Sequence, residues 1–462
     1  MTIRCDIAIV GAGPGGYVAA LRAAQLGAKV VLVEKDKLGG VCLNWGCIPT
    51  KTLLRTAEVL RLTREAAEYG VMVDGVRLDW GAAQKRKEGV VRRLTGGVKF
   101  LLEKAGVQLL FGTARFASPT ALEVVGANGQ ERVEARDYVI ATGSRPASLP
   151  IPGLEGPGVL TSDEALALEA LPESLLVIGA GPIGVEFATL FRACGVQVTL
   201  VELLPRVLPT LDEDLGAEVE RALKKAKVAV YTGSQVSKVE RSNGKYTVTI
   251  QQADQQSAVE VDKILVAVGR RPNVEGLGLD VLGVQVEKSG IKVDEFMHTN
   301  VPHIYAVGDV TGGILLAHVA MHEGVVAVEN AMGLQRAMNY AAVPSCVFSS
   351  PEVASVGLSE EQARQQGYDL HIGKFPFRGN GKALAQGEYE GLVKIVAESK
   401  YGQILGVHIV GPHASDLIQE GTLALTLEAT LDELEVTIHP HPTLSEAVAE
   451  AALAAKGRAL HS

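Results

Sequence analysis

The stretch CDIAIVGAGPGGYVAALRAAQLGAKVVLVE, residues 5–34, decides how this chain folds. It opens on a short β-branched run, turns through GAGPGG, continues with a helical apolar pattern and ends on a second apolar run. In this order, the pattern G-x-G-x-x-G is typical of a dinucleotide-binding βαβ unit. Gly11 permits the tight turn, Gly13 lets the backbone approach a pyrophosphate, and Gly16 allows close helix–strand packing. Glu34 ends the second strand, where its carboxylate is expected to accept hydrogen bonds from ribose hydroxyls.

A second copy of this pattern lies at residues 174–202, in SLLVIGAGPIGVEFATLFRACGVQVTLVE. The copy has its own three glycines and closing acid, Gly179, Gly181, Gly184 and Glu202. The acid follows the first glycine by 23 residues in both copies, from 11 to 34 and from 179 to 202. Each copy is followed by a similar strand and turn, VIATGSRP at 139–146 and LVAVGRRP at 265–272. The alternative is a pair of βαβ units that bind nothing, and the doubled pattern favours two dinucleotide sites.

Two dinucleotide sites in one chain suggest that electrons pass between two cofactors. A flavin that exchanges hydride with a nicotinamide is the common chemical arrangement, so we expect FAD and NAD. The second site favours NAD over NADP because Glu202 would repel a 2′-phosphate, and no arginine follows within three residues. Arg206, four residues further on, is a weaker signal in the opposite direction.

Length and composition bound the other possibilities. A chain of 462 residues exceeds the roughly 250–300 residues at which single cores stop growing, so several domains are expected. A net charge of −9 argues against nucleic acid or an anionic membrane as a partner. The N-terminus has no signal-peptide pattern, and no run of about 18 uncharged apolar residues predicts a membrane span. The five cysteines form no disulfide framework, so we expect a cytoplasmic protein in which any disulfide is a working one.

Two of the cysteines, Cys42 and Cys47, lie in GGVCLNWGCIPTK, residues 39–51. In an ideal helix, residues five apart are rotated by about 140° and their Cα atoms lie about 8–9 Å apart. A disulfide tolerates roughly 4.4–6.8 Å, so a bond between these cysteines requires a distorted turn. The surrounding glycines and Pro49 supply one, ahead of a helix predicted from Thr50 onward. At the N-terminal end of that helix, the dipole is expected to lower a thiol pKa.

Three interpretations of this pair remain open on the residues alone. A zinc site would need four ligands, and the sequence has no second cysteine pair, so we expect no metal. Two buried structural cysteines in a helix are a second possibility, which is also how we interpret Cys5, Cys194 and Cys346. A redox disulfide lying against the flavin is the third possibility, and it is the one that we favour.

Several motifs, in the same order, resemble one known family. They are GGVCLNWGCIPTK, the two glycine fingerprints, VGDV at 307–310 and HPHPTLSE at 439–446. Together they are similar to the pyridine nucleotide–disulfide oxidoreductases, from about residue 3 to the C-terminus. The resemblance implies an α/β fold with two Rossmann-like dinucleotide-binding domains, for FAD and NAD, and a C-terminal α+β dimerisation domain. The expected domains are FAD with the redox disulfide at 1–145, NAD at 146–270, a central domain completing the FAD site at 271–340, and an interface domain at 341–462.

The resemblance also implies roles for the redox residues. Cys42 matches the cysteine that exchanges with a dithiol substrate, and Cys47 matches the one that lies over the flavin ring. Lys51 matches a lysine that lies near the flavin and pairs with a glutamate, here Glu186, although a first-turn surface residue is the alternative for Lys51. The further flavin-binding residues are expected to be Gly112, Thr142, Gly143, Ser144, Asp309, Leu316, Ala317 and His318, in addition to Gly11, Gly13, Gly16 and Glu34. On the NAD side, the resemblance adds Val236 and Gly269 to Gly179, Gly181, Gly184 and Glu202.

The C-terminal motif supplies the expected base. Thr443 followed by Glu446 is a capping-box pattern, and a lone histidine is more often structural than catalytic, so the motif also has an ordinary interpretation. In the family, the second histidine is the base and the glutamate five residues later orients it, which matches His441 and Glu446 and leaves His439 non-catalytic. An imidazole can accept the proton that a dithiol must lose at neutral pH. Because the family's histidine reaches the disulfide across a two-fold interface, the expected protein is a homodimer with active sites shared between chains.

The implied reaction is oxidation of protein-bound dihydrolipoamide to lipoamide, with electrons passing through the cysteine pair and FAD to NAD⁺. The implied partner is a lipoyl-bearing acyltransferase or carrier protein of a 2-oxo acid dehydrogenase complex or glycine cleavage system. Reductases of glutathione or trypanothione are rivals, but they prefer NADPH, which Glu202 disfavours. A mercuric reductase would need a C-terminal cysteine pair, whereas this chain ends KGRALHS, and a transhydrogenase of the family lacks the redox pair. A non-catalytic scaffold subunit is disfavoured by the intact cysteine pair, His441 and Glu446.

Overall fold

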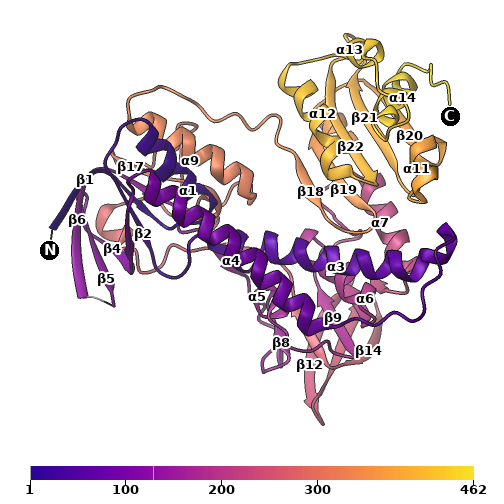
Figure 1. The fold of residues 1–462 in the computed structure, drawn as a ribbon, viewed down its shortest axis with the longest axis horizontal. Helices are drawn as coiled ribbons and strands as arrows, with labels where there is room; N and C mark the ends of the chain where they lie inside the picture. Colours follow the sequence, from indigo (N-terminus) through magenta and orange to yellow (C-terminus); the bar gives the residue numbers. More distant parts are fainter. Residues whose placement is uncertain (1, 128, 462) are drawn as a thin grey trace. The chain divides into compact units, whose positions relative to one another are not determined.

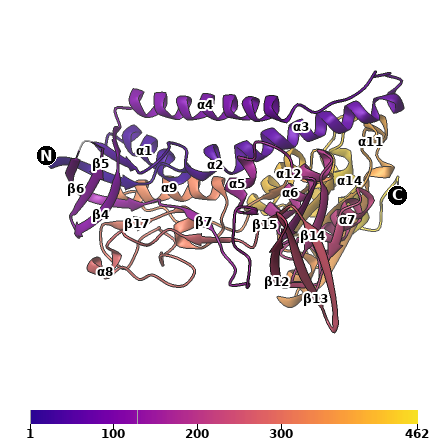
Figure 2. The ribbon, with the colours of Figure 1, turned by 90° about the horizontal axis from the view of Figure 1, so that it is seen from below.

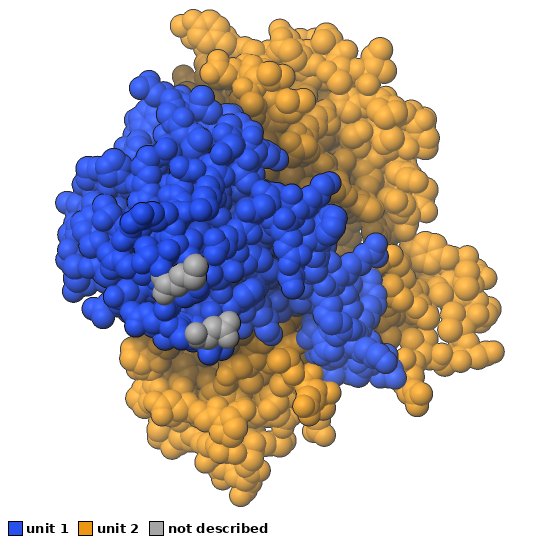
Figure 3. Space-filling model, turned by 60° about the vertical axis from the view of Figure 1, so that its left-hand side comes forward, with its two compact units in different colours: residues 1–53, 79–147, 269–339 blue, residues 54–78, 148–268, 340–462 orange. Residues whose placement is uncertain are grey.

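The computed structural model describes residues 2–127 and 129–461 of the chain. These residues form two compact units, each drawn from three stretches that are separated in sequence (Figure 3). Unit 1 is drawn from 1–53, 79–147 and 269–339, and unit 2 from 54–78, 148–268 and 340–462. The four domains expected from the sequence are a finer division than these units, and their boundaries stay a prediction.

Unit 1 is built on a seven-stranded sheet with the path β3-β2-β1-β6-β5-β4 and with β17 beside β6. Its strands are β1 (Thr2–Val10), β2 (Val30–Glu34), β3 (Gln108–Phe111), β4 (Thr113–Ser118), β5 (Ala121–Gly126), β6 (Gly129–Ile140) and β17 (Ile304–Ala306). β6 is parallel to β1 and β17 but antiparallel to β5, so a parallel dinucleotide sheet continues into an antiparallel meander. The parallel part brings the carboxyl ends of β1, β6 and β17 to one edge, where ligands bind in such folds.

Alternation of side chains along β1 gives unit 1 a core on each face of this sheet. Ile7 and Ile9 belong to one buried cluster, and Ala8 and Val10 belong to another. Three helices cover the first face, α1 (Pro14–Gln25), α4 (Trp80–Lys104) and α9 (Ala317–Ala331), and α1 packs on both of the others (Figures 1 and 2). The second face packs on the meander and on the segment that includes α8 (Leu279–Leu282). A two-stranded ladder, β7 (Ser144–Pro146) with β16 (Arg270–Pro272), completes this unit.

Unit 2 contains the second parallel sheet, in the order β11-β10-β9-β15-β8. Its strands are β8 (Val159–Leu160), β9 (Ser174–Ile178), β10 (Gln197–Val201), β11 (Ala229–Tyr231) and β15 (Lys263–Val266). Its helices are α5 (Ser162–Leu166), α6 (Pro182–Ala193) and α7 (Glu213–Lys225). A three-stranded antiparallel sheet packs on it through Tyr246, Val248 and Ile250, and consists of β12 (Gln235–Ser242), β13 (Lys245–Gln252) and β14 (Gln255–Val261).

The C-terminal part of unit 2 is an antiparallel sheet with helices on it, in the order β18-β19-β22-β21-β20. Its strands are β18 (Ser345–Val347), β19 (Glu352–Gly357), β20 (Leu370–Pro376), β21 (Leu392–Glu398) and β22 (Ile404–Gly411). α12 (Ala414–Thr426) packs on β19 and β22, and α14 (Glu446–Ala455) packs on β20 and β21 (Figure 1). Shorter helices complete it, α10 (Glu360–Gln365), α11 (Gly381–Gln386) and α13 (Leu431–Val436). Two parallel βαβ sheets and an α+β C-terminal part confirm the predicted fold class.

Across the described ranges, 2–127 and 129–461, no helix combines the length and the apolar character that a membrane crossing requires. Within the same ranges, His, Cys, Asp and Glu side chains nowhere gather into a group suited to hold a metal ion.

Candidate active site

The two cysteines of GGVCLNWGCIPTK lie in two helices with a break between them. Cys42 belongs to the short α2 (Gly40–Asn44), and Cys47 is the first residue of α3 (Cys47–Glu65). The break is at Trp45, whose φ of −149° and ψ of 30° are not helical. This confirms the distorted turn that the cysteine spacing predicted. The helix begins earlier than expected, because Pro49 falls in its first turn, where a missing N–H leaves no helical bond unmade.

The segment that carries the cysteines is held against the first glycine turn. Gly39 has a left-handed φ of +89°, and its N–H donates to Ala12 O at 2.8 Å. Asn44 Nδ2 donates to Gly40 O at 2.9 Å and to Leu38 O at 3.0 Å, which closes the segment on itself. The redox pair therefore lies in unit 1 beside the turn that is expected to hold the flavin pyrophosphate.

The Cys42 and Cys47 side chains lie next to each other and are hydrogen bonded. This bond raises the pKa of Cys42, and burial and the charge of Cys47 raise it further. Lys51 lowers the pKa of Cys42, whereas Asp309 raises it. The sequence predicted a lowered thiol pKa from the helix dipole, and for Cys42 that expectation is wrong because the neighbouring sulfur and burial outweigh the dipole.

A carboxylate, a hydroxyl and a guanidinium meet at the carboxyl end of the unit 1 sheet. Asp309 lies in the 3₁₀ turn Gly308–Thr311 that follows β17, and Ser144 Oγ donates to its Oδ2 at 2.5 Å. Arg270 Nε donates to Ser144 Oγ at 2.6 Å and lies 3.8 Å from Asp309 Oδ2. Gly308 N–H donates to the buried carboxylate of Glu323 at 2.6 Å, which holds the turn.

Other residues expected at the flavin lie near this group in unit 1. Thr142 Oγ1 donates to Asn273 O at 2.7 Å, and Asn273 N–H donates to Gly143 O at 2.9 Å. Leu316 is the N-cap of α9, so Ala317 and His318 form its first turn. The structure thus brings several of the predicted flavin residues to one edge of one sheet, and their roles there stay a prediction.

The first glycine turn is shaped to admit a ligand at Gly13. Gly11 has a φ of +100°, and a Cβ at Gly16 would lie 1.8 Å from Gly11 O, so the chain itself requires glycine at both positions. Gly13 differs, because its φ of −67° suits any residue and the nearest atom to an added Cβ is 4.0 Å away. Neither conformation nor packing explains this glycine, whereas close approach of a phosphate to the start of α1 does. The turn therefore fits a dinucleotide.

The acid that closes the first βαβ unit holds the glycine turn. Glu34 Oε2 accepts the Ala12 N–H at 2.7 Å, and Oε1 accepts the Asp36 N–H at 2.8 Å. Each carboxylate oxygen has a further lone pair, so the proposed bonds to a ribose remain geometrically open. Gly112 N–H donates to Glu34 O at 2.9 Å, and a Cβ on Gly112 would lie 2.7 Å from Val125 O. Close packing of strands is therefore a sufficient structural reason for Gly112.

The second glycine turn has the same geometry. Gly179 has a φ of +101°, a Cβ on Gly184 would lie 1.8 Å from Gly179 O, and an added Cβ on Gly181 would meet nothing within 4 Å. Glu202 accepts the Ala180 N–H at 2.6 Å and the Leu204 N–H at 2.8 Å. By the same argument, the second turn also fits a dinucleotide.

The remaining residues predicted for the NAD side are spread over the two units. Ser234 N–H donates to the backbone oxygen of Glu202, the residue that follows β10, at 2.9 Å. Val236, two residues further on in β12, therefore lies near the carboxyl end of β10. Gly269, with a φ of +108°, belongs to unit 1. Glu186 is buried in α6, and its Oε1 accepts the Phe348 N–H at 3.0 Å. Because Lys51 and Glu186 belong to different units, their pairing stays a prediction.

Arg206, the sequence signal for a 2′-phosphate, is engaged elsewhere in unit 2. Its Nη2 donates to Pro209 O at 3.2 Å and lies 3.2 Å from Glu361 Oε2. A guanidinium already paired with a carboxylate attracts a phosphate less strongly, and Glu202 adds repulsion. Both observations favour NAD over NADP at the second turn.

The two histidines of HPHPTLSE differ in their surroundings. His439 is 7% exposed, and Nε2 lies 2.7 Å from Glu420 Oε1 while Nδ1 lies 3.0 Å from Thr437 O. The hydrogen bond to Glu420 raises the pKa of His439, against the effect of burial. His441 is 78% exposed, and its Nδ1 lies 2.8 Å from Glu446 Oε1. One histidine is thus occupied at both nitrogens, whereas the other presents its ring to the surface of the chain.

Glu446 serves both of the interpretations that the sequence left open. Its Oε2 accepts the Thr443 N–H at 2.8 Å, as in half of a capping box, while its Oε1 binds His441. Burial opposes ionisation, but the Thr443 N–H and His441 lower the pKa of Glu446. An ionised carboxylate on Nδ1 places the ring proton there and leaves Nε2 as the basic nitrogen. The N-cap of α14 is Ser445 rather than Thr443, whose hydroxyl donates instead to Pro440 O at 2.7 Å.

Comparison with protein families decides the class of this chain. Residues 5–324 match the family described as pyridine nucleotide-disulphide oxidoreductase, and residues 343–452 match the dimerisation domain of the same family. The chain belongs to this family. The resemblance inferred from the motifs is therefore confirmed.

Individual relatives agree with this assignment over their whole length. A dihydrolipoyl dehydrogenase of Bacillus subtilis is 46% identical over 473 residues that cover 100% of both chains. One from Thermus scotoductus is 46% identical and covers 99% of this chain and 98% of its own. Among solved structures, LpdA from Mycobacterium tuberculosis has a TM-score of 0.90 at 30% identity, and covers 97% of this chain and 99% of its own. The flavoprotein disulfide reductase RclA from Escherichia coli has a TM-score of 0.88 at 28% identity, with the same coverage.

As a pyridine nucleotide-disulphide oxidoreductase with the family's dimerisation domain, the chain forms a homodimer. Exposed apolar residues occur on this domain at Leu423, Leu427, Val436 and Ile438, and Ile438 directly precedes the HPHPTLSE motif. An apolar surface of this kind is typical of an obligate interface.

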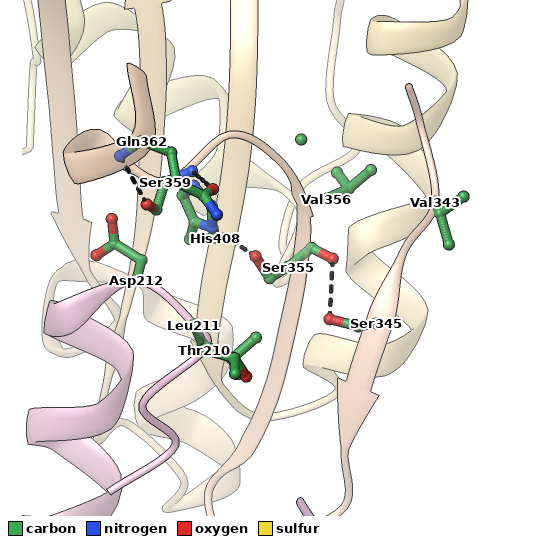
Figure 4. Close-up of a pocket in the computed structure, with 11 residues that line it drawn as sticks. Thr210, Leu211, Asp212, Val343, Ser345, Ser355, Val356, Ser359, Gln362 and His408 are labelled. Carbon is green, nitrogen blue, oxygen red and sulfur yellow. Dashed lines mark hydrogen bonds between the residues drawn. The ribbon is translucent and has the colours of Figure 1, made fainter. Parts of the chain in front are cut away.

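A cavity of about 150 Å³ lies in unit 2, and none of the residues that line it is among those predicted for the reaction (Figure 4). Serine and threonine hydroxyl groups line much of the cavity, and the buried His408 also lines it. His408 Nδ1 lies 2.6 Å from Ser355 Oγ and Nε2 lies 2.9 Å from Leu358 O. Burial lowers the pKa of His408, so its neutral ring donates to Leu358 O and accepts from Ser355. His408, Ser355, Ser359 and Gln362 are thus hydrogen bonded to other groups of the cavity wall, and we interpret the cavity as structural.

Beside this cavity, a buried lysine joins the second βαβ unit to the dimerisation domain. Lys394 Nζ lies 2.9 Å from Asp212 Oδ1, 2.6 Å from Asp214 Oδ2 and 2.9 Å from Glu360 Oε2. The side chains of Lys394 and Asp212 are 3% and 2% exposed. Sequence analysis missed this cluster, although a lone lysine inside the apolar run of β21 was a usable signal. It also missed Arg270, which lies in the LVAVGRRP repeat.

Proposed function

We propose that this protein oxidises dihydrolipoamide carried on a partner protein and passes the electrons to NAD⁺. The observation that carries the proposal is the hydrogen-bonded pair Cys42–Cys47, held against a dinucleotide turn. The full-length relatives named dihydrolipoyl dehydrogenase support the choice of substrate. The cofactors are FAD and NAD, and two glycine turns with matching acids are present to bind them.

Residues contributed by the two chains of the homodimer suffice for the dithiol–disulfide exchange. His441 of the partner subunit, oriented by its glutamate, takes a proton from one substrate thiol at Nε2. The substrate thiolate then attacks Cys42 Sγ, the Cys42–Cys47 bond breaks, and Cys47 leaves as a thiolate. The second substrate thiol attacks the mixed disulfide and gives its proton to the released Cys42, which closes lipoamide, while His441 keeps the first proton. Two electrons have moved from substrate to the cysteine pair.

The protonation state of the released pair fits its next task. The exchange leaves a proton on Cys42 and a thiolate on Cys47, the cysteine that the resemblance places over the flavin ring. A bound FAD would supply the two-electron chemistry that connects the cysteine pair to the nicotinamide. Gly13 and the start of α1 would bind its pyrophosphate, and Asp309 would hold its ribityl chain. Gly181, the start of α6 and Glu202 would bind the adenosine half of NAD.

The finer partner assignments belong to this proposal. The homodimer is proposed to share its active sites, with the cysteine pair of one chain served by His441 of the partner subunit. The carrier is proposed to be the lipoyl-bearing acyltransferase or carrier protein of a 2-oxo acid dehydrogenase complex or glycine cleavage system. A cytoplasmic location stays a prediction.

One assay tests the substrate assignment. The purified protein is mixed with dihydrolipoamide and NAD⁺ and, in parallel, with glutathione disulfide and NADPH, while nicotinamide absorbance is followed. We expect turnover in the first mixture only, because Glu202 and the engaged Arg206 disfavour a 2′-phosphate. Turnover in the second mixture alone would show that the substrate assignment is wrong.

Subunit exchange tests the shared active site. Chains that carry Cys47→Ser are combined with chains that carry His441→Gln under conditions that allow exchange. A heterodimer then holds one site in which both residues are intact, so it should have about half the activity of the native dimer, and an equimolar mixture at equilibrium should have about a quarter. In the control, chains that carry His439→Gln take the place of the chains that carry His441→Gln, because the His439 side chain is only 7% exposed and is paired with Glu420. No recovery despite verified heterodimers would exclude sharing.

A further inference from the structure

Arg270 binds one residue of the neighbouring strand at two points. β16 and β7 pair antiparallel, with Arg270 opposite Pro146 and Pro272 opposite Ser144. The Nε of Arg270 donates to Ser144 Oγ at 2.6 Å, and Nη2 donates to Ser144 O at 2.9 Å. The Arg270 side chain is 12% exposed, so these bonds are largely shielded from water. A planar guanidinium can reach a hydroxyl and a carbonyl together, which a lysine cannot do from two fixed points.

The Ser144 hydroxyl passes this contact on to Asp309. Because Ser144 Oγ accepts from Arg270, its single proton is directed to Asp309 Oδ2, 2.5 Å away. The cation also lies 3.8 Å from the same carboxylate oxygen. A hydroxyl between a guanidinium and a carboxylate is polarised from both sides, which strengthens both bonds.

The backbone of the Asp309 turn is held by different groups. Glu323 accepts the Gly308 N–H at 2.6 Å, and Thr311 Oγ1 donates to Gly308 O at 2.9 Å. These bonds fix where the turn lies, but the orientation of the Asp309 side chain depends on the side chains that touch it. Arg270 and Ser144 supply that orientation.

We propose that Arg270 is a positioning residue of the redox site, which holds the Asp309 carboxylate in one orientation through Ser144 and offsets its charge. The proposal rests on the proposed function, because Asp309 is expected to contact the ribityl chain of FAD. Asp309 is also close enough to Cys42 to act on it electrostatically, as Lys51 does with opposite sign. Arg270 therefore belongs to the charged surroundings of both the flavin position and the sulfur pair.

The test compares Arg270→Met with Arg145→Met, a matched control from the same two-stranded ladder. Arg145 follows Ser144 on β7 and is 46% exposed, and it forms a two-point ion pair with Glu275 at 2.6 and 2.8 Å. It therefore reproduces the loss of a paired arginine without disturbing Asp309. The readouts are the rate at which flavin is released, followed by its fluorescence, and the reduction potential of the bound flavin.

We expect Arg270→Met to release flavin at least about tenfold faster than the native protein, the range expected for losing a hydrogen bond to a charged group. The flavin potential should fall, because Arg270→Met removes the cation that offsets the Asp309 carboxylate, and an uncompensated carboxylate disfavours the reduced, negatively charged ring. Arg145→Met should change the release rate by less than about twofold. Equal release rates and potentials in the two variants would overturn the proposal.

Arg270→Lys keeps the test decisive if Arg270→Met does not fold. It retains the charge and the aliphatic stem but loses the two-point contact, so release should be about threefold faster or more. Behaviour identical to the native protein would exclude the two-point contact. A native protein that binds no flavin and turns over no dihydrolipoamide would instead show that the proposed function is wrong. Native flavin binding and turnover with an unaffected Arg270→Met would reject only the role of Arg270.

Discussion

The two glycine turns of this protein are nearly identical, whereas the segments that come after their second strands have different tasks. In both turns the closing acid accepts two backbone N–H groups, Glu34 from Ala12 and Asp36, and Glu202 from Ala180 and Leu204. The first glycine has a φ of +100° in one turn and +101° in the other. Each turn is thus determined by the same few contacts of its own backbone.

Even the attachment of the next segment is shared. In the first unit, Gly39 N–H donates to Ala12 O at 2.8 Å. In the second, Leu208 N–H donates to Ala180 O at 2.9 Å, and Leu208 also has a left-handed φ, of 50°. After this common contact, one segment continues into Cys42 and Cys47, and the other continues into Asp212 and the Lys394 cluster.

The difference shows where this fold accepts new chemistry. Each turn is held by hydrogen bonds shorter than 3 Å between its backbone N–H groups and the carboxylate of its closing acid, so the turn tolerates little change. The segment attached to it is free to carry either a redox pair or a structural junction. Function is therefore specified by this attached segment rather than by the dinucleotide motif itself.

Loss of the redox pair should have the largest effect. Cys47→Ser removes the leaving group of the disulfide exchange, so dihydrolipoamide turnover with NAD⁺ should fall by about 10³-fold or more while flavin stays bound. Cys194→Ser, at the end of α6 in the second unit, is the control. Burial raises the pKa of Cys194 to about 11, so its thiol is unreactive and activity should be unchanged. More than a tenth of native activity in Cys47→Ser would contradict the assigned role.

The junction in the second unit should affect stability instead. Lys394→Met leaves the buried Asp212 carboxylate without its lysine, and breaking a buried pair in this way costs about 3–5 kcal/mol. The urea midpoint of unfolding should drop strongly at pH 7.5. Lys224→Met removes an exposed ion pair with Glu220 on α7, and should cost about 0.5 kcal/mol or less. A Lys394→Met midpoint equal to that of Lys224→Met would show that the cluster contributes no stability.

The pH dependence of that loss has a defined sign. Burial opposes ionisation of Asp214 and Glu360. However, Lys374 and Lys394 lower the pKa of Asp214, and Lys394 and Arg364 lower the pKa of Glu360. A depressed carboxyl pKa adds stability above the unfolded pKa of about 4, and that stability is lost as pH falls through the folded value. Because Lys394→Met loses part of this effect, its difference in unfolding free energy from the native protein should stay constant from pH 7.5 to about pH 5 and shrink as pH falls below about 4. A difference that widens would contradict this account.

The middle glycines should separate ligand binding from folding. Gly13→Ala and Gly181→Ala place a Cβ where the protein leaves at least 4.0 Å of space, so stability should change by less than about 1 kcal/mol. Gly13→Ala should weaken flavin retention by about tenfold or more, and Gly181→Ala should raise the KM for NAD⁺ by a similar factor. Flavin content and steady-state kinetics distinguish the two. Loss of flavin in Gly181→Ala, with KM unchanged, would reverse the assignment of the two turns.

The closing acids should give the smallest effect. Glu202→Gln keeps the shape of the side chain but removes the charge that repels a 2′-phosphate, so kcat/KM for NADP⁺ should rise by about three- to tenfold relative to NAD⁺. Glu34→Gln makes the same change in the first unit and should leave this ratio as it is. A ratio that shifts equally in both variants would mean that the effect is indirect.

Much of this architecture was predictable because it depends on local patterns. The spacing of glycines and acids identified both βαβ units, and the unfavourable helical distance between Cys42 and Cys47 identified the break at Trp45. The exact start of α3 was not predictable. A proline is compatible both with a position just before a helix and with the first turn of a helix, and Pro49 lies in the first turn.

The long-range polar contacts were not predictable from the same patterns. Lys394 and Asp212 are 182 residues apart, and charged residues are expected on the surface unless a partner is known. Arg270 and Ser144 are 126 residues apart and meet only because β16 pairs with β7. The raised pKa of Cys42 likewise depends on burial and on a neighbouring sulfur, which a helix-dipole argument does not include.

The exposure of His441, at 78% in the single chain, has a consequence for gene dosage. Under the proposed function, a newly synthesised chain carries half of each of two catalytic sites and is silent until it meets a second copy. When the chain concentration is well below the dimer dissociation constant, the concentration of active dimer should then follow the square of the chain concentration, because each dimer takes two chains. A cell that makes few copies would thus be protected from stray electron transfer by solitary chains.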